Sequence, residues 1–270
     1  MTKTLRKAML STICMLVVAV LSLTGITYAW FTSGTTATVS GMKVEVAVAD
    51  GGVQVREIKD GNTTPWAATL DLNTKLTTVK PVSSADGVNF FGVTLDTTDS
   101  TKYSVAAIDT ATKTANVITK TIQFTNPGAT DVTIALNSTN STITAIKNDT
   151  TGIEAANHNI HKAARVAIIV GETTYIWTPH TGEYVALVGA NATTADYHNV
   201  VSGTSETVEI TSAGDCEITL PANPTTLESN FVTVTLVIWL EGQDGNCVNV
   251  NAGGAFDVAL QFEVQTATQG

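Results

Sequence analysis

Two of the four histidines stand close enough together to hold one ligand. His158 and His161 are three residues apart, and on a helix this spacing puts both rings on one side. The pair is one residue shorter than the His-Glu-x-x-His zinc motif, and Asn159 stands where its glutamate would be. The spacing therefore favours two solvated histidines near a helix end over a metallopeptidase centre.

A second candidate site is an oxygen-rich stretch near the C-terminus. Its acidic and amide residues are Glu241, Asp244, Asn246, Asn249, Asn251 and Asp257. Calcium takes six to eight oxygen ligands from loops of this kind, although the spacing differs from that of an EF-hand. The same residue types also populate ordinary β-turns, through side-chain hydrogen bonds to the backbone. Glu241, Asp244 and Asn246 are thus candidate calcium ligands, and we expect no other cofactor.

The cysteines offer a disulfide rather than a nucleophile. Cys14 lies in an apolar N-terminal leader, which leaves Cys216 and Cys247. In an exported chain they can form one disulfide, closing a loop of about 30 residues and adding roughly 3 to 4 kcal/mol; the alternative is two reduced, buried thiols. The chain has no Gly-x-Ser-x-Gly elbow, Walker loop or Gly-x-Gly-x-x-Gly fingerprint. We therefore expect a protein that is not an enzyme.

The leader predicts export. Lys3, Arg6 and Lys7 precede an apolar stretch, residues 8–26, which closes on small residues ending at Ala29. This is typical of a secretory signal peptide cleaved after Ala29 by signal peptidase, which is the expected partner during export. Polar residues interrupt the stretch, which disfavours the alternative of a permanent transmembrane helix. We expect a secreted protein at the cell surface, with no membrane anchor after cleavage.

The remaining chain is strongly acidic. Removing three basic residues with the leader leaves 11 basic against 24 acidic residues, a net charge of −13 on 241 residues (270 − 29). Such a surface repels nucleic-acid phosphates, so a nucleic-acid partner is not expected. A chain of this length buries a substantial core.

Apolar and polar residues alternate along most of the chain, which is typical of half-buried strands. We expect an antiparallel β-sandwich of jelly-roll type over residues 51–270, preceded by an N-terminal strand segment at 30–50. A Pro-Gly turn predicts a hairpin over 118–136, and a second hairpin is expected around 178–182. Helical spacing from Ile153 to Ala164 predicts one short helix. The expected strands cover 43–48, 88–95, 118–124, 132–136, 165–170, 173–177, 183–188, 231–240 and 256–264.

Several segments carry a family resemblance. The leader end Thr27-Tyr28-Ala29-Trp30-Phe31 resembles that of TasA and camelysin, exported matrix-fibre proteins with a SipW-type signal peptide. Residues 122–128 and 260–264 are similar to that family's strand-then-turn element and closing strand. Residues 237–247 resemble a Trp-Leu-Glu-Gly-x-Asp-x-x-Cys signature of clostridial surface proteins, with Gly245 where many members have proline. The resemblance implies an extracellular jelly-roll subunit of fibres or pilus-like filaments of a biofilm matrix.

The mature N-terminus suggests how such a subunit assembles. Residues 30–40 are uncharged and rich in threonine, so they can add as a strand to another copy. Repeated head-to-tail donation builds a filament of identical copies, with Trp30, Phe31, Ala37 and Val39 as the assembly residues. The alternative is that the segment folds back onto its own sheet.

A different function stays open, that of a monomeric surface adhesin binding glycans or host proteins. Its binding platform would use aromatic side chains, namely Trp66, Tyr103, Tyr175, Trp177, Tyr184 and Tyr197. Core or cross-strand packing is the competing use of these residues.

Overall fold

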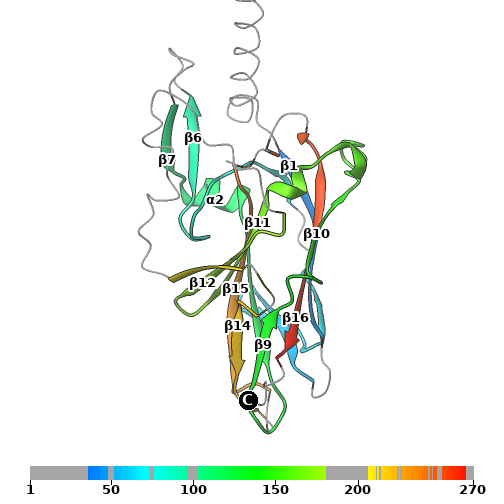
Figure 1. Ribbon diagram of the computed structural model, residues 1–270, viewed down its shortest axis with the longest axis vertical. Helices are drawn as coiled ribbons and strands as arrows, with labels where there is room; N and C mark the ends of the chain where they lie inside the picture. The colour runs from blue at the N-terminus through cyan, green and yellow to red at the C-terminus, as the bar shows by residue number, and fades with distance from the viewer. Residues whose placement is uncertain are drawn as a thin grey trace, which may run out of the picture.

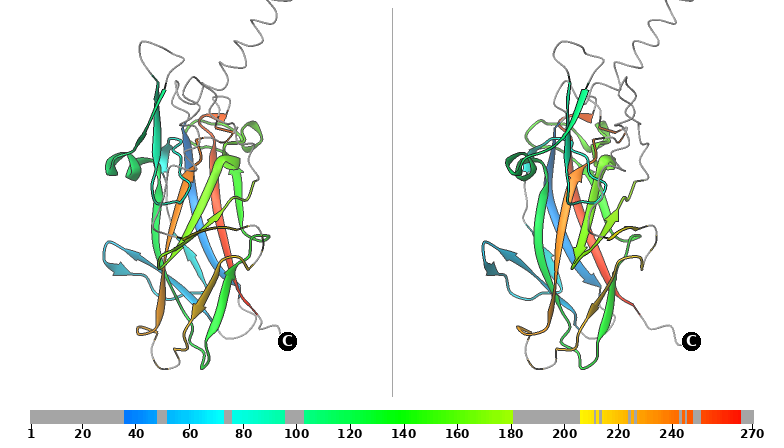
Figure 2. Two further views of the ribbon diagram at one scale, coloured as in Figure 1. Left: turned by 60° about the vertical axis from the view of Figure 1, so that its left-hand side comes forward. Right: turned by 90° about the vertical axis from the view of Figure 1, so that its left-hand side faces the viewer.

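The protein is built mainly from β-strands, as the alternation predicts (Figures 1 and 2). The computed structural model describes residues 36–47, 52–72, 76–95, 103–180 and 206–265, apart from 211, 213, 224, 226, 243, 245 and 248–250. The leader and the expected strand at 183–188 lie outside these residues. Within the described ranges, no helix is both long and apolar enough to cross a membrane.

The first sheet, sheet A, contains both ends of the described chain. Its order is β14 (Glu217–Leu220), β9 (Val132–Leu136), β16 (Ala255–Val264), β1 (Ala37–Ala47) and β4 (Thr69–Asp71). β10 (Thr142–Ile146) also pairs with β16, and β5 (Leu76–Val79) also pairs with β1. β1 and β16 run parallel, whereas the other described pairs of this sheet are antiparallel.

The second sheet is sheet B. Its order is β13 (Glu206–Ile210), β12 (Thr173–Trp177), β11 (Ala164–Val170), β15 (Phe231–Leu240), β8 (Ile118–Thr125), β2 (Gln54–Lys59) and β3 (Asn62–Thr63). A separate two-stranded sheet pairs β6 (Phe91–Leu95) with β7 (Tyr103–Ala107). The predicted strands at 165–170, 231–240 and 256–264 are confirmed, and the one predicted at 88–95 is shorter, as β6.

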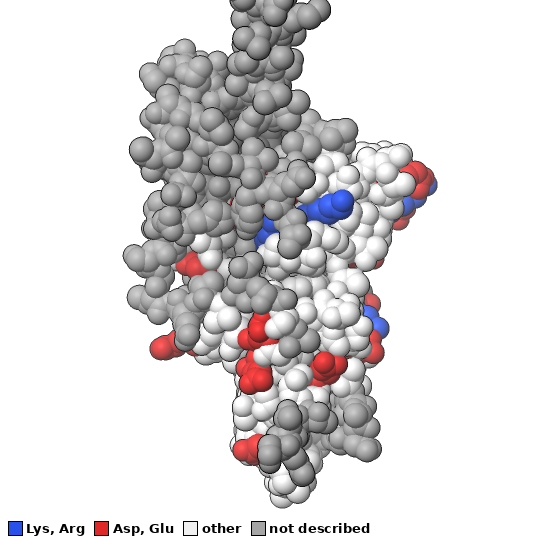
Figure 3. Space-filling view, in the orientation of Figure 1, with Lys and Arg blue, Asp and Glu red and all other residues white. Residues whose placement is uncertain are grey.

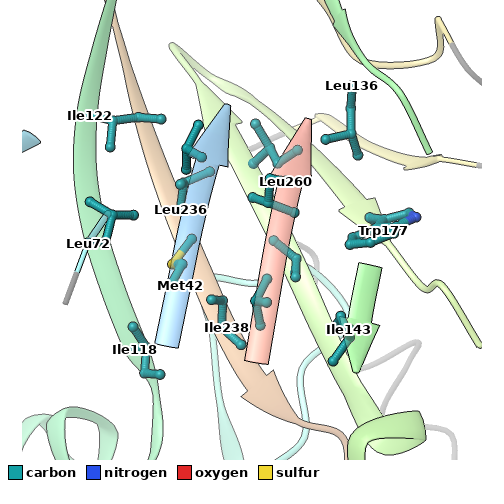
Figure 4. Close-up of a cluster of buried hydrophobic side chains, with 14 of the residues drawn as sticks. Met42, Leu72, Ile118, Ile122, Leu136, Ile143, Trp177, Leu236, Ile238 and Leu260 are labelled. Carbon is teal, nitrogen blue, oxygen red and sulfur yellow. The ribbon is translucent and has the colours of Figure 1, made fainter. Parts of the chain in front are cut away.

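The core lies where the two sheets face each other. Figure 4 shows Met42 of β1 and Leu260 of β16 beside Leu236 and Ile238 of β15, and all four are buried. A smaller apolar cluster includes Trp239 and residues of the 82–117 region. Neighbouring residues of β15 therefore face different clusters, because successive side chains of a strand point to opposite faces.

The hairpin predicted over 118–136 is wrong. Both strands form, but β8 belongs to sheet B and β9 to sheet A. β15 and β2 occupy the two edges of β8 over residues 121–125, which leaves no edge for β9. The turn signal at 126–131 was real, since Gly128 N–H and the Thr130 carbonyl both bond the Asn126 side chain. The turn carries the chain from one sheet to the other.

The helix predicted from Ile153 to Ala164 is also wrong. The segment forms two 3-10 turns, η1 (Ala155–Asn157) and η2 (Ile160–Ala163), separated by an extended His158. Two asparagines flank this break, and asparagine competes with helical hydrogen bonds. The described α-helix is α2 (Thr110–Asn116), whose Asp109 side chain accepts from the Thr112 N–H at 2.7 Å. Its threonine-rich sequence gave no apolar period.

The second predicted hairpin is not the pairing that β12 makes. β12 pairs antiparallel with β11 and parallel with β13 along all five of its residues.

Candidate functional site

The strand β1 occupies an inner position of sheet A. On one side it pairs with β16 from Thr38 to Ala47. On the other side it pairs with β5 through its first residues and with β4 through Lys43–Glu45. β4 and β5 have no other partner strand in this sheet among the described residues. The place that β1 fills is therefore a slot for one extended segment, and we call it the β1 slot.

Side chains of β1 fix its register in the slot. Ala37, Val39, Met42, Val44 and Val46 are at most 3% exposed and lie in the core. A run from 42 to 46 alternates regularly, but Val39 and Met42 are three apart.

A β-bulge resolves this mismatch. Val39 pairs with Phe256 and Gly41 pairs with Asp257, so Ser40 is the extra residue. The bulge keeps both Val39 and Met42 facing inward. The break in the alternation between Val39 and Met42 is the sequence signal for the bulge, which the predicted strand at 43–48 did not include.

Backbone bonds fasten both ends of β1. At its start, Gly253 N–H donates to the Thr36 carbonyl at 2.7 Å, and Thr38 N–H donates to the Gly254 carbonyl at 2.9 Å. The Asn148 amide group also donates to Thr38 Oγ1 and to the Gly253 carbonyl. Near its end, Val46 N–H donates to the Ala68 carbonyl at 2.9 Å.

The predicted assembly residues divide between two regions. Ala37 and Val39 lie in the chain's own β1 slot, whereas Trp30 and Phe31 lie outside the described residues. The fold-back alternative thus describes the position of residues 37–47 in the single chain.

The signature segment at the end of β15 forms a buried polar network. The Arg165 guanidinium donates to Asp244 at 2.6 Å and to the carbonyls of Lys162 and Ala164 at 3.0 Å. Asp244 also accepts from the backbone and side-chain amides of Asn246. Both members of this ion pair are almost wholly buried.

Glu241 joins the segment that contains Ser83 and Ser84 to the end of β15. It accepts from Ser83 Oγ, from the Ser84 N–H and from Trp239 Nε1 at 3.1 Å. The Trp239 ring meets Phe90 edge to face, with ring centroids 5.5 Å apart. The signature residues therefore join the strand end to residues 83–90.

In this network, the candidate calcium ligands are hydrogen-bonded to other groups of the protein. Glu241 and Asp244 bind donors of the protein itself, and the Arg165 charge stands against Asp244. The Asn251 side chain accepts from the Asn159 N–H and donates to the Asn246 carbonyl. Asn249 is outside the described residues, and Asp257 lies on β16 next to Gly41. In the described part of the chain, no three His, Cys, Asp or Glu side chains are grouped to hold a metal.

The predicted disulfide is absent from the structure. Cys216 and Cys247 are both free thiols, and both are buried. Cys216 lies by the Leu136 backbone, and Leu136 pairs with Phe262 near the end of β16. Cys247 bonds the Asp244 carbonyl through its N–H, in the network described above. Burial raises the pKa of Cys216 to about 12 and that of Cys247 well above its usual range. The alternative of two reduced, buried thiols fits this arrangement.

Three histidines meet beside β10, one more than the sequence suggested. The His161 ring lies edge to face with His158 at 6.3 Å and with His180 at 5.1 Å between centroids. His158 is buried rather than solvated, with Nε2 3.1 Å from the Ile146 carbonyl oxygen. His180 Nε2 lies 3.2 Å from the Ile143 carbonyl oxygen. No local signal links His180 to the other two, because it follows a different strand.

The candidate aromatic platform is not assembled by the described residues. Trp66 stacks on the Arg56 guanidinium at 4.2 Å, and both donate to Glu228. Trp177 is buried in the core, and the partly buried Tyr175, also on β12, packs against that core cluster. β2, which carries Arg56, and β12 lie toward opposite ends of sheet B. The side chains of Tyr103, Tyr184 and Tyr197 are outside the described set.

Comparison of the chain with protein-family models, with curated proteins and with solved structures gives no match.

Proposed function

We propose that the mature chain is an exported structural subunit of a fibre, and that it assembles by donating β1 to the β1 slot of the next copy. The fold proposed for the subunit is a β-sandwich of jelly-roll type. The observation that carries the proposal is the position of β1: the first described strand is an inner strand of sheet A. The resemblance to the TasA and camelysin matrix proteins points the same way.

The energetics of β1 favour exchange over an empty slot. Burying a valine or methionine side chain stabilises a fold by roughly 1.5 to 3 kcal/mol, and Val39, Met42, Val44 and Val46 are all buried. Their sum is of the order of a whole domain's stability. The slot therefore has to be filled, by the chain's own β1 or by that of another copy.

Exchange preserves these contacts. A strand donated to an identical copy makes the same contacts there, which is why swapping costs little. β1 is joined to the rest of the described chain at one end only, through residues 48–53. If each copy fills the slot of the next, the contact is head to tail and does not close, so it builds a filament.

A cross-link between β1 and β16 tests the proposal. Lys43 and Ala259 are direct partners in the register of the two strands, and Lys43 is exposed. Neighbouring strands lie about 4.8 Å apart, which is within the range of a disulfide. Residues 30–270 carrying Lys43→Cys and Ala259→Cys would be assembled, oxidised and run on a denaturing gel without reductant.

Donation predicts a ladder of covalent oligomers that collapses to one band on reduction. Filaments that yield only monomers with an internal cross-link would overturn strand donation. A chain that remains monomeric under all assembly conditions would favour the adhesin instead. The single variants Lys43→Cys and Ala259→Cys are matched controls, and the native thiols are buried.

A further inference from the structure

The three histidines stand where several parts of the fold meet. His158 and His161 belong to the connection between β10 and β11, and His180 follows β12 of sheet B. Through the Ile143 and Ile146 carbonyls, His180 and His158 both hold β10 of sheet A. We call His158, His161 and His180 the histidine cluster.

The cluster is built for neutral rings. His158 Nδ1 and His161 Nδ1 are buried and have no hydrogen-bond partner. A neutral imidazole leaves one nitrogen as a lone pair, which tolerates this, whereas an imidazolium carries N–H on both nitrogens. Protonation would therefore bury a donor without an acceptor, which costs free energy.

Charge acts in the same direction. The groups that face His161 are His158, His180 and Lys162, and burial together with these neighbours lowers its pKa to about 4. β10, packed against η2, contributes no ionisable side chain over Thr142–Ile146. β16 also packs against η2 and carries Asp257 and Glu263, which act on other groups: Asp257 contacts Gly41, and Glu263 accepts from Asn137. Among the described residues, no carboxylate offsets the charge of Lys162 beside His161.

The cluster also touches the segment that fastens β1. A Cβ atom on Gly254 would lie 2.6 Å from the His158 ring, so only glycine allows this contact. The Gly254 carbonyl accepts from Thr38 N–H, and Gly253 N–H donates to the Thr36 carbonyl. A displaced His158 ring would thus disturb the residues that hold the start of β1.

We propose that the histidine cluster is a proton-sensitive latch, which holds β10 and the start of β1 when its rings are neutral and releases them when they become protonated. If β1 is donated between copies, as proposed above, acid would promote the exchange. That consequence rests on the proposed function, but the latch itself does not.

The sign of the pH effect follows from His161. Its pKa is lower in the folded chain than in the unfolded chain, where it has the ordinary value of about 6.5. Above about pH 6.5 both states are neutral at this residue and it costs nothing. As the pH falls toward 4, the open state gains a proton that the closed state refuses, so opening becomes easier.

Amide hydrogen exchange on the monomeric mature chain tests the latch. Between about pH 7 and about pH 4.5, protection of residues 142–146 and 155–163 should fall by at least about tenfold, after correction for intrinsic rates. Protection of β15 residues 231–240 should stay unchanged and serves as the internal reference. Unchanged protection of the cluster segments at the lower pH would overturn the proposal.

Two variants assign the effect to the cluster. His161→Gln removes the proton site and should abolish most of the acid-induced loss; the same loss in this variant would overturn the latch. Lys162→Gln removes a cationic neighbour that lowers the pKa of His161, so the closed state should accept the proton more readily and the acid-induced loss of protection should be smaller. An acid-induced loss in Lys162→Gln as large as that in the parent chain would also contradict the latch, and this variant serves if His161→Gln fails to fold.

The readouts separate the two proposals. Acid-induced opening in the monomer together with no cross-linked ladder would keep the latch and reject strand donation. A ladder that forms equally well at both pH values, in a chain whose cluster never opens, would keep strand donation and reject the latch.

Discussion

The ion pair between Arg165 and Asp244 is a deeply buried polar contact of the signature segment. Each partner is at most 2% exposed at its side chain, and the guanidinium has further bonds to two carbonyls. A buried pair of this kind contributes little net stability, but removing one partner leaves the other charge uncompensated. The pair therefore matters chiefly through what its loss exposes.

We expect Asp244→Ala to lower the free energy of unfolding by about 3 to 5 kcal/mol. Urea denaturation followed by circular dichroism measures this. The matched control is Glu154→Ala, which removes an exposed pair with Lys147 and should cost much less, because water screens exposed ion pairs. Equal effects of the two substitutions would contradict the assigned role of the buried pair.

The thiols give a second prediction at the scale of residues. Because burial raises the pKa of both Cys216 and Cys247, the reactive thiolate is scarce in the folded chain. We expect the folded mature chain to resist a thiol reagent at neutral pH, and the denatured chain to react at both cysteines without prior reduction. If the denatured protein reacts only after reduction, the two cysteines form the disulfide and the prediction of free thiols is wrong.

At the scale of elements, the bulge in β1 distinguishes two single-residue deletions. Deleting Ser40 removes the extra residue and leaves Val39 and Met42 facing the core. Deleting Lys43 instead forces a shift of one residue between Met42 and Val44, which flips side chains to the other face.

We expect deletion of Lys43 to cost at least about 3 kcal/mol, since two or more apolar side chains leave the core. Deletion of Ser40 should be much milder. Thermal unfolding of the two deletion variants beside the parent chain provides the comparison. A chain that tolerates both deletions equally would show that the register of β1 is not fixed as described.

The net charge is a property of the whole molecule. The mature chain carries 11 basic and 24 acidic residues. On the face drawn in Figure 3, acidic side chains are scattered over the lower part, and others lie beside basic ones along the right-hand edge. If copies assemble as proposed, each brings the same excess of acidic residues, so the copies repel one another and association is slow at low ionic strength.

We expect assembly of the mature chain to accelerate as salt rises from about 0.01 M to about 0.15 M, where the screening length falls to about 8 Å. Light scattering over time measures the rate. Faster assembly at the lower salt concentration would mean that complementary charges, rather than the buried strand, drive association.

The sequence by itself determined several of the strands and their buried faces, whereas others, such as β2, β10 and β14, were not predicted. The alternation in 256–264 located β16, because a strand with one buried face has a period of two, and the long apolar run in 231–240 located β15. The signature around Trp239 was visible in the sequence, but the buried hydrogen bonds that its residues make were not. The resemblance predicted fibre assembly, which stays a prediction.

Only the tertiary structure decided which strands pair and which distant side chains meet. A turn signal at 126–131 marks a change of direction, but whether β9 joins β8 depends on the strands that already occupy its edges. His180 reaches His161 because sheet B brings the end of β12 beside η2. Arg165 pairs with Asp244 across 79 residues in the same way. Local spacing sets the face that each residue presents, whereas contacts between distant residues are fixed by the packing of the two sheets.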